Sequence, residues 1–388
     1  MRVGRWFAAT ALREAAPQLF VAGALACFVV LLLGFEHSTL GLLLVVFLAA
    51  AALSELRLAW IARRSLGVVD DALEGIERRE GPSVPRSHLV IPPLMFVTRG
   101  VKRERGACFA EVDGTKLRLD VYRPSNPEPG DLPSSAVIQV HGGGWLAGSR
   151  YEQGIPLLNH LAALGWVGFN IDYRLSPQAT WPDHIVDVKL AIAWVREHAD
   201  ELGIDPEMIA VTGGSAGGHL AALAALSEND PLFQPGFESS DTSVAAAVPF
   251  YGVYDLTDAG GVYYPELLEW AFEKVVVKKK LADEPELYRA ASPSWRVHAD
   301  APPFMVIHGD RDTLVPVGDA RLFVEKLRGV SQRPVHYVEL PGAEHAFDLW
   351  PSLRTAAVAE AIGRFLTTVD EERRVDASAR GVRAQAIA

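Results

Sequence analysis

The hexapeptide Gly213-Gly214-Ser215-Ala216-Gly217-Gly218 is the segment of the chain best suited to chemistry. A short apolar run precedes it and a helical pattern follows, so Ser215 is expected at a tight strand-to-helix turn. Such a turn strains the serine backbone, and the residues two positions away on either side must lack side chains, as Gly213 and Gly217 do. The first-turn amides of the helix then favour negative charge beside the serine, which makes Ser215 a candidate nucleophile.

A serine hydroxyl needs a base at neutral pH, and two downstream loops offer the partners. The segment FMVIHGDRDTLVP places Asp312 in a loop after an apolar run, and LPGAEHAF places His345 in a loop before the last predicted helix. His345 is expected to take the Ser215 proton and later deliver it to the leaving group. Asp312 is expected to fix the imidazole tautomer and stabilise the imidazolium.

Other side chains compete for these roles. Asp310 lies two residues before the favoured aspartate and stays open as the acid. His308 and His336 compete with the favoured histidine, but each lies within a predicted strand rather than a loop. His219 follows the nucleophile on its helix and is expected to be a packing residue.

A second glycine cluster, His141-Gly142-Gly143-Gly144-Trp145, directly follows the short apolar run at 136–140. Its glycines let backbone N–H groups approach a substrate oxygen closely, and with the N–H of Ala216 they can form an oxyanion hole. The alternative is a flexible turn that happens to be glycine-rich. His141 is expected to shape this loop by hydrogen bonding rather than to act as a base.

The elements that position these loops alternate along the chain. Short apolar runs typical of buried strands lie at 116–124, 136–140, 167–174, 208–213, 245–252, 304–310 and 335–342. Helical patterns lie between or after them at 183–201, 216–227, 317–328 and 353–369. This alternation predicts an α/β fold, with a mostly parallel, doubly wound central sheet and helices on both faces, over residues 108–369.

Three segments depart from this pattern. Residues 255–301 carry several aromatic side chains and are expected to form a cap-like insertion over the site, the alternative being an ordinary surface helix pair. Residues 65–107 are proline-containing and mixed in character, as in a linker or lid segment. The polar segment 370–388 is expected to be a disordered tail.

Two uncharged apolar runs lie near the start of the sequence, at Leu19–Phe35 and Thr39–Leu53. With flanking residues each approaches the ~20 helical residues that cross a bilayer. We therefore expect residues 1–64 to form a membrane anchor of two transmembrane helices; the alternatives are a single anchor, a signal peptide or a buried helix pair.

Basic residues flank this anchor and are absent from its turn: Arg2, Arg5 and Arg13 before it, and Arg57, Arg63 and Arg64 after it. The positive-inside rule then predicts that both ends, and with them the catalytic domain, are cytoplasmic.

The composition excludes several other functions. A net charge of -11 and a pI near 5.5 argue against nucleic-acid binding, which needs a basic face. The two cysteines, Cys27 and Cys108, indicate neither a disulfide framework nor a thiolate metal site. Without a P-loop, a dinucleotide fingerprint or an HExxH motif, we expect no cofactor and no metal.

Taken together, HGGGW, DYRLSP, GGSAGGHLAALAAL, HGDRDTLVP and GAEHAF resemble the hormone-sensitive-lipase-like esterases and related α/β-hydrolases, over roughly residues 108–368. The resemblance implies an α/β-hydrolase fold and cleavage of a carboxylic ester through an acyl-enzyme on Ser215. It also implies oxyanion donors at Gly143, Gly144 and Ala216. The expected substrate is a small ester with an apolar acyl group.

The chain departs from this family at Gly214. The family's usual motif at the strand-to-helix turn of the nucleophile, called the elbow, is GDSAGG and has an aspartate at this position. HGGGW also resembles the HGGxW of formamidase-type relatives, so an amide substrate, arylformamide or peptide, stays open. The alternative of another class is a non-catalytic, membrane-anchored binding protein.

Overall fold

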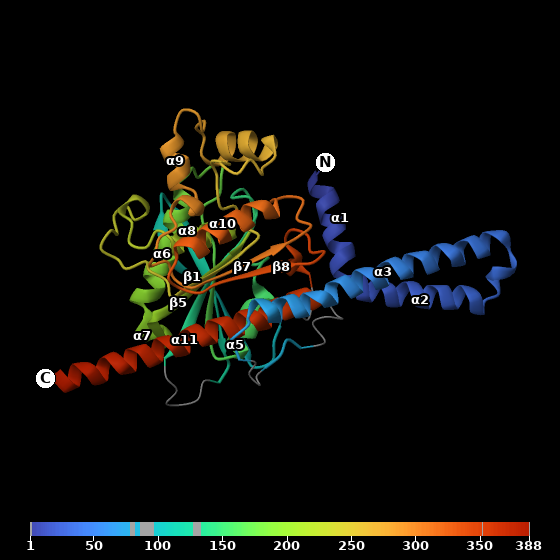
Figure 1. The fold of residues 1–388 in the computed structure, drawn as a ribbon, viewed down its shortest axis with the longest axis horizontal. Helices are drawn as coiled ribbons and strands as arrows, with labels where there is room; N and C mark the ends of the chain where they lie inside the picture. The colour runs from blue at the N-terminus through green and yellow to red at the C-terminus, as the bar shows by residue number, and fades with distance from the viewer. Residues whose placement is uncertain (1, 78–81, 86–96, 127–132, 351, 388) are drawn as a thin grey trace.

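A computed structural model of the chain describes residues 2–77, 82–85, 97–126, 133–350 and 352–387 (Figure 1). Its centre is an eight-stranded sheet in the order β1-β2-β4-β3-β5-β6-β7-β8. The strands are β1 (Val101–Val112), β2 (Thr115–Pro124), β3 (Ser134–Val140), β4 (Val167–Ile171), β5 (Ile204–Gly214), β6 (Ala246–Phe250), β7 (Phe304–Gly309) and β8 (Val335–Leu340). Among the strand pairs that the structure describes, only β1–β2 and β2–β4 are antiparallel, which confirms the predicted mostly parallel sheet.

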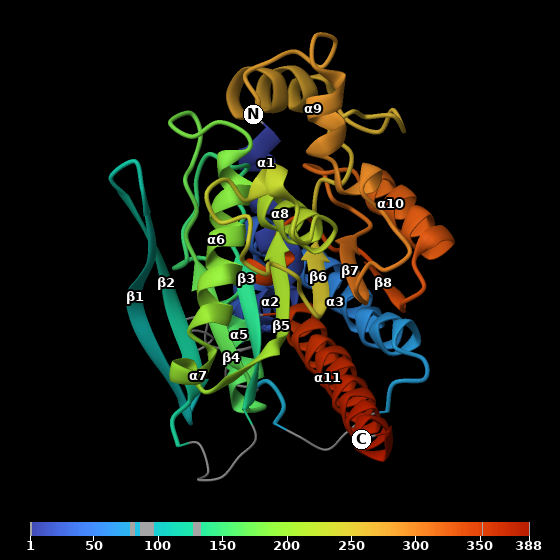
Figure 2. The ribbon, with the colours of Figure 1, turned by 90° about the vertical axis from the view of Figure 1, so that its left-hand side faces the viewer.

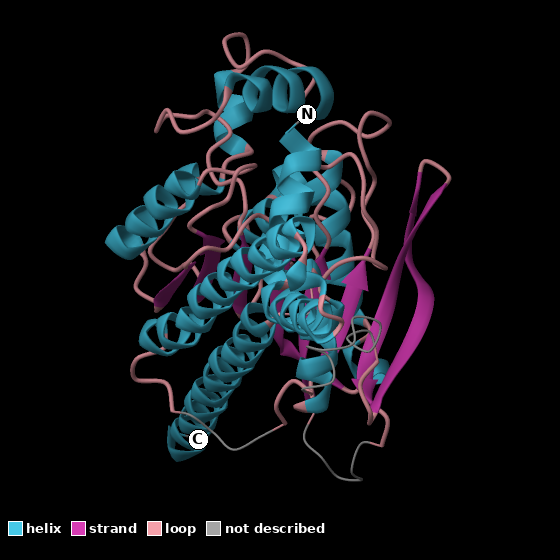
Figure 3. Cartoon of the chain, turned by 90° about the vertical axis from the view of Figure 1, so that its right-hand side faces the viewer, coloured by secondary structure: helices cyan, strands magenta, loops and turns pink. Residues whose placement is uncertain are grey.

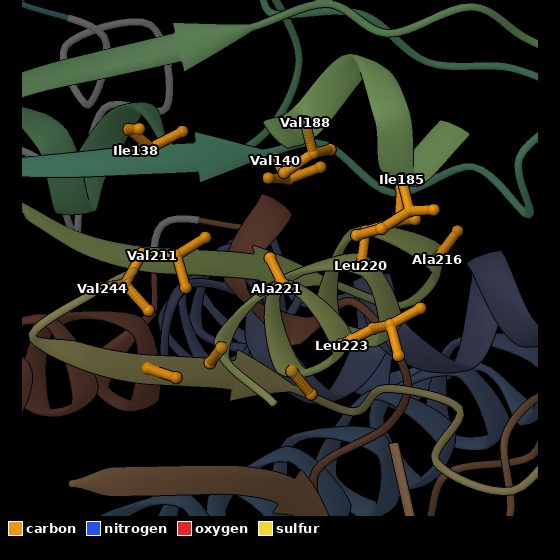
Figure 4. Packing of buried hydrophobic residues seen from close by; sticks show 14 of the residues in the cluster. Ile138, Val140, Ile185, Val188, Val211, Ala216, Leu220, Ala221, Leu223 and Val244 are labelled. Atoms are coloured by element: carbon orange, nitrogen blue, oxygen red, sulfur yellow. The ribbon is translucent and has the colours of Figure 1, made fainter. Parts of the chain in front are cut away.

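Helices cover both faces of the sheet, as predicted (Figure 3). One face carries α6 (Asp183–Glu197), α8 (Ala216–Ala225) and α10 (Val317–Val330); the other carries α5 (Ile155–Ala163) and α11 (Leu353–Ile387). Figure 4 shows Val140 of β3 next to Val188 of α6, with Leu220 and Leu223 of α8 in the same core of the first face. The strands are apolar because both sides of them face such helices, and α8 is thereby fixed directly after β5.

Among the described residues, three α-helices precede the sheet: α1 (Arg2–Glu14), α2 (Ala16–Leu32) and α3 (Thr39–Ala72). In Figure 1, α2 and the first half of α3 lie side by side and project away from the sheet. Among the described residues, α3 alone is long and apolar enough to cross a membrane by itself. A second candidate exists only if residues 8–14 and α2, bent by 76°, are counted as one span. The two-span anchor therefore stays a prediction.

The expected boundaries of the anchor and linker differ from the structure. Helix α3 continues past residue 64 to Ala72, because its last turns are amphipathic and bury Val69 and Leu73 beside α11 and β8. Strand β1 begins at Val101, so the sheet starts inside the expected linker. Part of the segment predicted as a linker or lid, residues 78–81 and 86–96, lies outside the described residues.

The tail expected to be disordered is also different, since α11 runs through to Ile387. Its sequence is polar but rich in alanine, arginine and glutamate, which are good helix formers. Arg374 pairs with Asp370 at 2.9 Å one turn earlier and donates to the Pro133 carbonyl at 3.1 Å. Polarity had suggested disorder where helix propensity and these contacts favour a helix.

Residues 255–301 leave the sheet after β6 and return at β7. They form a π-helix (Leu267–Val276), the short helix α9 (Pro285–Ala290) and connecting loops. Figure 2 shows this insertion above the ends of the central strands, beside the start of α1. Asp319 of α10 connects the insertion to the domain. It accepts hydrogen bonds from the hydroxyl of Tyr263, within the insertion, and from the amide of Tyr254, which directly precedes the insertion, the latter at 2.6 Å.

Candidate active site

Ser215 lies between β5 and α8 with φ 58° and ψ −120°, the strained geometry that the glycine pattern predicted. A Cβ atom at Gly217 would lie 2.1 Å from the Val140 carbonyl oxygen, and one at Gly213 would lie 2.5 Å from that of Gly217. Both positions therefore exclude any side chain. The turn leaves the Ser215 side chain partly exposed at the first turn of α8.

Ser215, His345 and Asp312 form a hydrogen-bonded row. His345 Nε2 lies 2.9 Å from Ser215 Oγ, and His345 Nδ1 lies 2.7 Å from Asp312 Oδ2. The Asp312 carboxylate can only accept a hydrogen bond, so His345 Nδ1 carries the proton. Nε2 is then the ring nitrogen that can accept a proton from the serine. Asp310, the alternative acid, instead accepts the Gly342 amide at 2.6 Å and holds the turn before His345.

Asp312 is buried yet well supplied with donors. Its Oδ1 accepts the amides of Leu314 and Val315 at 2.9 and 2.8 Å, and His308 Nε2 lies 3.2 Å from its Oδ2. Burial alone would raise the pKa of Asp312, but the neighbouring His345 and His308 outweigh it and hold that pKa below its usual value. The Asp312 carboxyl is therefore ionised at neutral pH.

The three competing histidines occupy other positions. His308, in β7, contacts Asp312 but its Nε2 also lies 3.0 Å from the Val315 carbonyl oxygen. His336 Nδ1 lies 2.8 Å from the Ala72 carbonyl oxygen, at the end of α3. His219 lies under the site beside the Ala291 carbonyl oxygen, and burial lowers its pKa to about 4, so it is a neutral packing residue as expected.

The loop His141–Trp145 faces Ser215 from the end of β3. Gly143 and Gly144 have φ values of 115° and 62°, and within the described part of the chain neither amide donates to another protein group. Ala216 begins α8, so its amide also lacks an intrahelical acceptor. These three amides are available to an oxyanion.

The remaining members of this loop are structural. The Gly142 amide is already bonded to the Gln153 side chain, and a Cβ on Gly142 would lie 2.7 Å from the Gly214 carbonyl oxygen. His141 is buried, its ring stacks on Tyr173 at 4.4 Å, and burial lowers its pKa. It therefore shapes the loop as a neutral group.

A buried polar row beside the site was missed by the sequence analysis. Gln153 Nε2 donates to the Tyr251 hydroxyl at 2.6 Å, that hydroxyl donates to Asp348, and the Tyr251 ring packs on His345 at 4.6 Å. A Cβ at Gly214 would lie 2.4 Å from Gln153 Nε2. The sequence signal for this cluster was Gly214, which stands where related esterases have an aspartate. Gln153 and Tyr251 fill the space that an aspartate side chain would need.

Ser215 opens into a pocket of about 470 Å³. Its walls include the loop His141–Trp145, Leu267, Trp270 and Ala271 of the insertion, and Leu314 and Leu349 from the segments that follow Asp312 and His345. Trp6 of α1 also lines it, although residues 1–64 were expected to form only an anchor. The pocket is mostly apolar, with Glu152 as its one charged lining residue among those described apart from the histidines.

Comparison with known proteins finds esterases and other carboxylic ester hydrolases. The BD-FAE family model matches residues 119–327, more than half of the chain. The probable carboxylic ester hydrolase LipM of Mycobacterium tuberculosis is 52% identical over 66% of this chain and 59% of its own length. Esterase LipQ of the same organism is 48% identical over 66% of this chain and 60% of its own length. The butyrate-bound esterase 2 of Thermogutta terrifontis has a TM-score of 0.57 at 30% identity, covering 73% of this chain and 95% of its own.

The matched region spans only about 60% of the length of these two curated relatives. The BD-FAE match at residues 119–327 contains the turn at Ser215, the loop His141–Trp145 and Asp312, and it ends before His345. The chain belongs to the BD-FAE family, within the hormone-sensitive-lipase-like α/β-hydrolases that the motifs around Ser215 indicate.

Proposed function

We propose that the chain hydrolyses carboxylic esters through an acyl-enzyme on Ser215. One observation carries this proposal: the Ser215 hydroxyl lies 2.9 Å from an imidazole that a buried carboxylate orients, and it faces two free glycine amides. A hydroxyl, a base, an orienting acid and oxyanion donors are together the requirements of acyl transfer.

In the first half-reaction, Ser215 Oγ attacks the ester carbonyl carbon while its proton passes to His345 Nε2. The carbonyl oxygen becomes an oxyanion beside the amides of Gly143, Gly144 and Ala216. Collapse of this intermediate breaks the ester C–O bond, and His345 gives its proton to the leaving alcohol. Water then repeats the sequence on the acyl-enzyme and releases the carboxylic acid.

The substrate that fits this pocket is an uncharged ester with an apolar acyl group. Tryptophan and leucine side chains form much of its wall, and Glu152 disfavours a second negative charge. The Thermogutta terrifontis relative was solved with butyrate, which supports a short to medium acyl chain here.

The test is hydrolysis of a p-nitrophenyl ester series, from acetate to dodecanoate, by the full chain in detergent or nanodiscs. Ser215→Ala is the matched control and should lose at least about 10³-fold in kcat. A matched amide and an arylformamide are assayed beside the esters. Amide turnover at or above ester turnover would transfer the proposal to amide hydrolysis, and equal rates in parent and Ser215→Ala would end it.

We also propose that α2 and α3 anchor the protein in a membrane with the catalytic domain on the cytoplasmic side. The apolar side chains of the projecting half of this helix pair are exposed, among them Phe28, Leu32, Leu43 and Phe47. Bilayer hydrocarbon would cover this surface, whereas water would leave a large apolar patch uncovered. The basic residues at both ends of the pair support the cytoplasmic orientation.

A further inference from the structure

The first helix of the chain touches the loop that carries His345. Trp6 Nε1 donates a hydrogen bond of 2.8 Å to the backbone carbonyl oxygen of His345 itself. The two rings also meet edge to face, with centroids 6.1 Å apart. An indole N–H is a fixed donor on a rigid ring, so this bond restrains the backbone from which the imidazole reaches Ser215.

The same helix reaches the acid loop through a buried carboxylate. Arg13 Nη1 pairs at 3.2 Å with Glu344, whose side chain is fully buried. Glu344 Oε1 accepts the Thr313 amide at 2.6 Å and the His345 amide at 3.2 Å. Glu344 therefore ties the residue after Asp312 to the residue that supplies the base, and Arg13 balances its charge.

Trp6 is also part of the substrate pocket. It lines the same cavity as Ser215, together with Leu267 and Trp270 of the insertion. Figures 1 and 2 both show the start of α1 close to this insertion. A side chain that closes the pocket on one side limits the length of acyl group that the pocket accepts.

We propose that α1 is a functional part of the active site, with Trp6 as both a positioning residue for His345 and a determinant of acyl-chain length. Arg13 is a second positioning residue, acting through Glu344. This inference rests on the proposed esterase function. Because only Ala15 separates α1 from α2, the seating of the apolar helix pair is mechanically linked to the loops of His345 and Asp312.

The experiment compares Trp6→Phe, Trp6→Ala and Arg13→Gln in the full chain, with Trp60→Phe as the control. Trp60 is 61% exposed on α3 and lies outside the pocket. Each variant is assayed for kcat and KM across the p-nitrophenyl ester series. The rate at which a fluorophosphonate labels Ser215 gives a second readout that needs no ester, and thermal melting checks folding.

Trp6→Phe keeps an aromatic wall but removes the donor, so kcat should fall about 3- to 10-fold, the worth of one hydrogen bond, with the chain-length optimum unchanged. Trp6→Ala should lower kcat further and move the optimum toward longer acyl chains. Arg13→Gln should slow both turnover and labelling without moving the optimum, and Arg13→Lys should recover part of the loss. Trp60→Phe should match the parent.

A parent-like kcat, optimum and labelling rate in both Trp6 variants would overturn the inference. Activity losses that follow the losses in melting temperature across the variants, with no change in the acyl-chain optimum, would show that α1 only packs against the domain. That outcome would also overturn the inference. If Trp6→Ala does not fold, the kcat and labelling rate of Trp6→Phe decide. A parent inert toward both esters and fluorophosphonate would instead refute the proposed function.

Discussion

The Gln153 side-chain oxygen accepts the backbone amide of Gly142 at 2.6 Å, while its nitrogen donates to the Tyr251 hydroxyl. The buried Gln153 side chain thus joins the loop His141–Trp145 to the tyrosine that packs on His345. Because Gly142 precedes the two glycines with free amides, its orientation determines where those amides point. The loop is held by a side chain from outside the HGGGW motif.

Replacing Gln153 with Leu should therefore lower kcat with little change in KM. Both hydrogen bonds are lost and the Gly142 amide is left buried without its partner, which costs about 1–3 kcal/mol, or roughly 5- to 150-fold in rate if it is expressed in the transition state. Steady-state kinetics on one short ester measures it. Gln332→Leu, at an exposed position, is the control. A change confined to KM would contradict the role assigned to Gln153.

The elbow glycines give a second prediction. In Gly217→Ala, the new methyl group would lie 2.1 Å from the Val140 carbonyl oxygen, so backbone must move and both melting temperature and activity should drop. Gly329→Ala in α10 meets no atom within 4 Å and should be neutral or stabilising by about 0.4–1 kcal/mol. Similar melting curves for the two variants would show that the elbow tolerates a side chain.

Features that depend on nearby residues could be predicted from the sequence, whereas contacts between distant residues could not. The alternation of strands and helices and the turn around Ser215 were predicted correctly, because each depends on periodicity or on glycines within a few residues. The hydrogen bond from Trp6 to His345 joins positions 339 residues apart, and no local pattern indicates such a partner. Trp6 was read only as part of a membrane anchor, since the apolar runs that follow it dominate that segment.

The acid assignment can be tested by two matched substitutions. Asp312→Asn keeps the acceptor for the Leu314 and Val315 amides but presents an N–H₂ group to His345 Nδ1, which forces the wrong imidazole tautomer. The kcat should fall by about 10⁴-fold. Asp310→Asn can still accept the Gly342 amide and should stay within a few-fold of the parent. The reverse ranking would move the acid to Asp310.

Asp319 predicts a pH dependence of stability. Burial is the main reason why its pKa rises to about 7, despite the hydrogen bonds from Tyr263 and Tyr254. In the unfolded chain the same carboxyl loses its proton near pH 4. Between these values the folded state holds a proton that the unfolded state has released, so stability falls as pH rises through this window. Asp319→Asn, whose side-chain oxygen can still accept both bonds, should lose that fall. Melting temperatures from pH 5 to 8 measure it, and a constant gap between variant and parent would contradict it.

The two cysteines offer a test of the membrane orientation. Cys108 is exposed on β1 of the catalytic domain, whereas Cys27 lies within the apolar helix α2, and both thiols are free. A membrane-impermeant maleimide should therefore label inverted vesicles, with the cytoplasmic face outward, and should not label right-side-out vesicles. Cys108→Ser should abolish the labelling of inverted vesicles, because bilayer hydrocarbon shields Cys27 from a polar reagent. Labelling of right-side-out vesicles would place the catalytic domain on the opposite face. Labelled protein that washes off the vesicles in alkaline carbonate would show that α2 and α3 do not cross the bilayer.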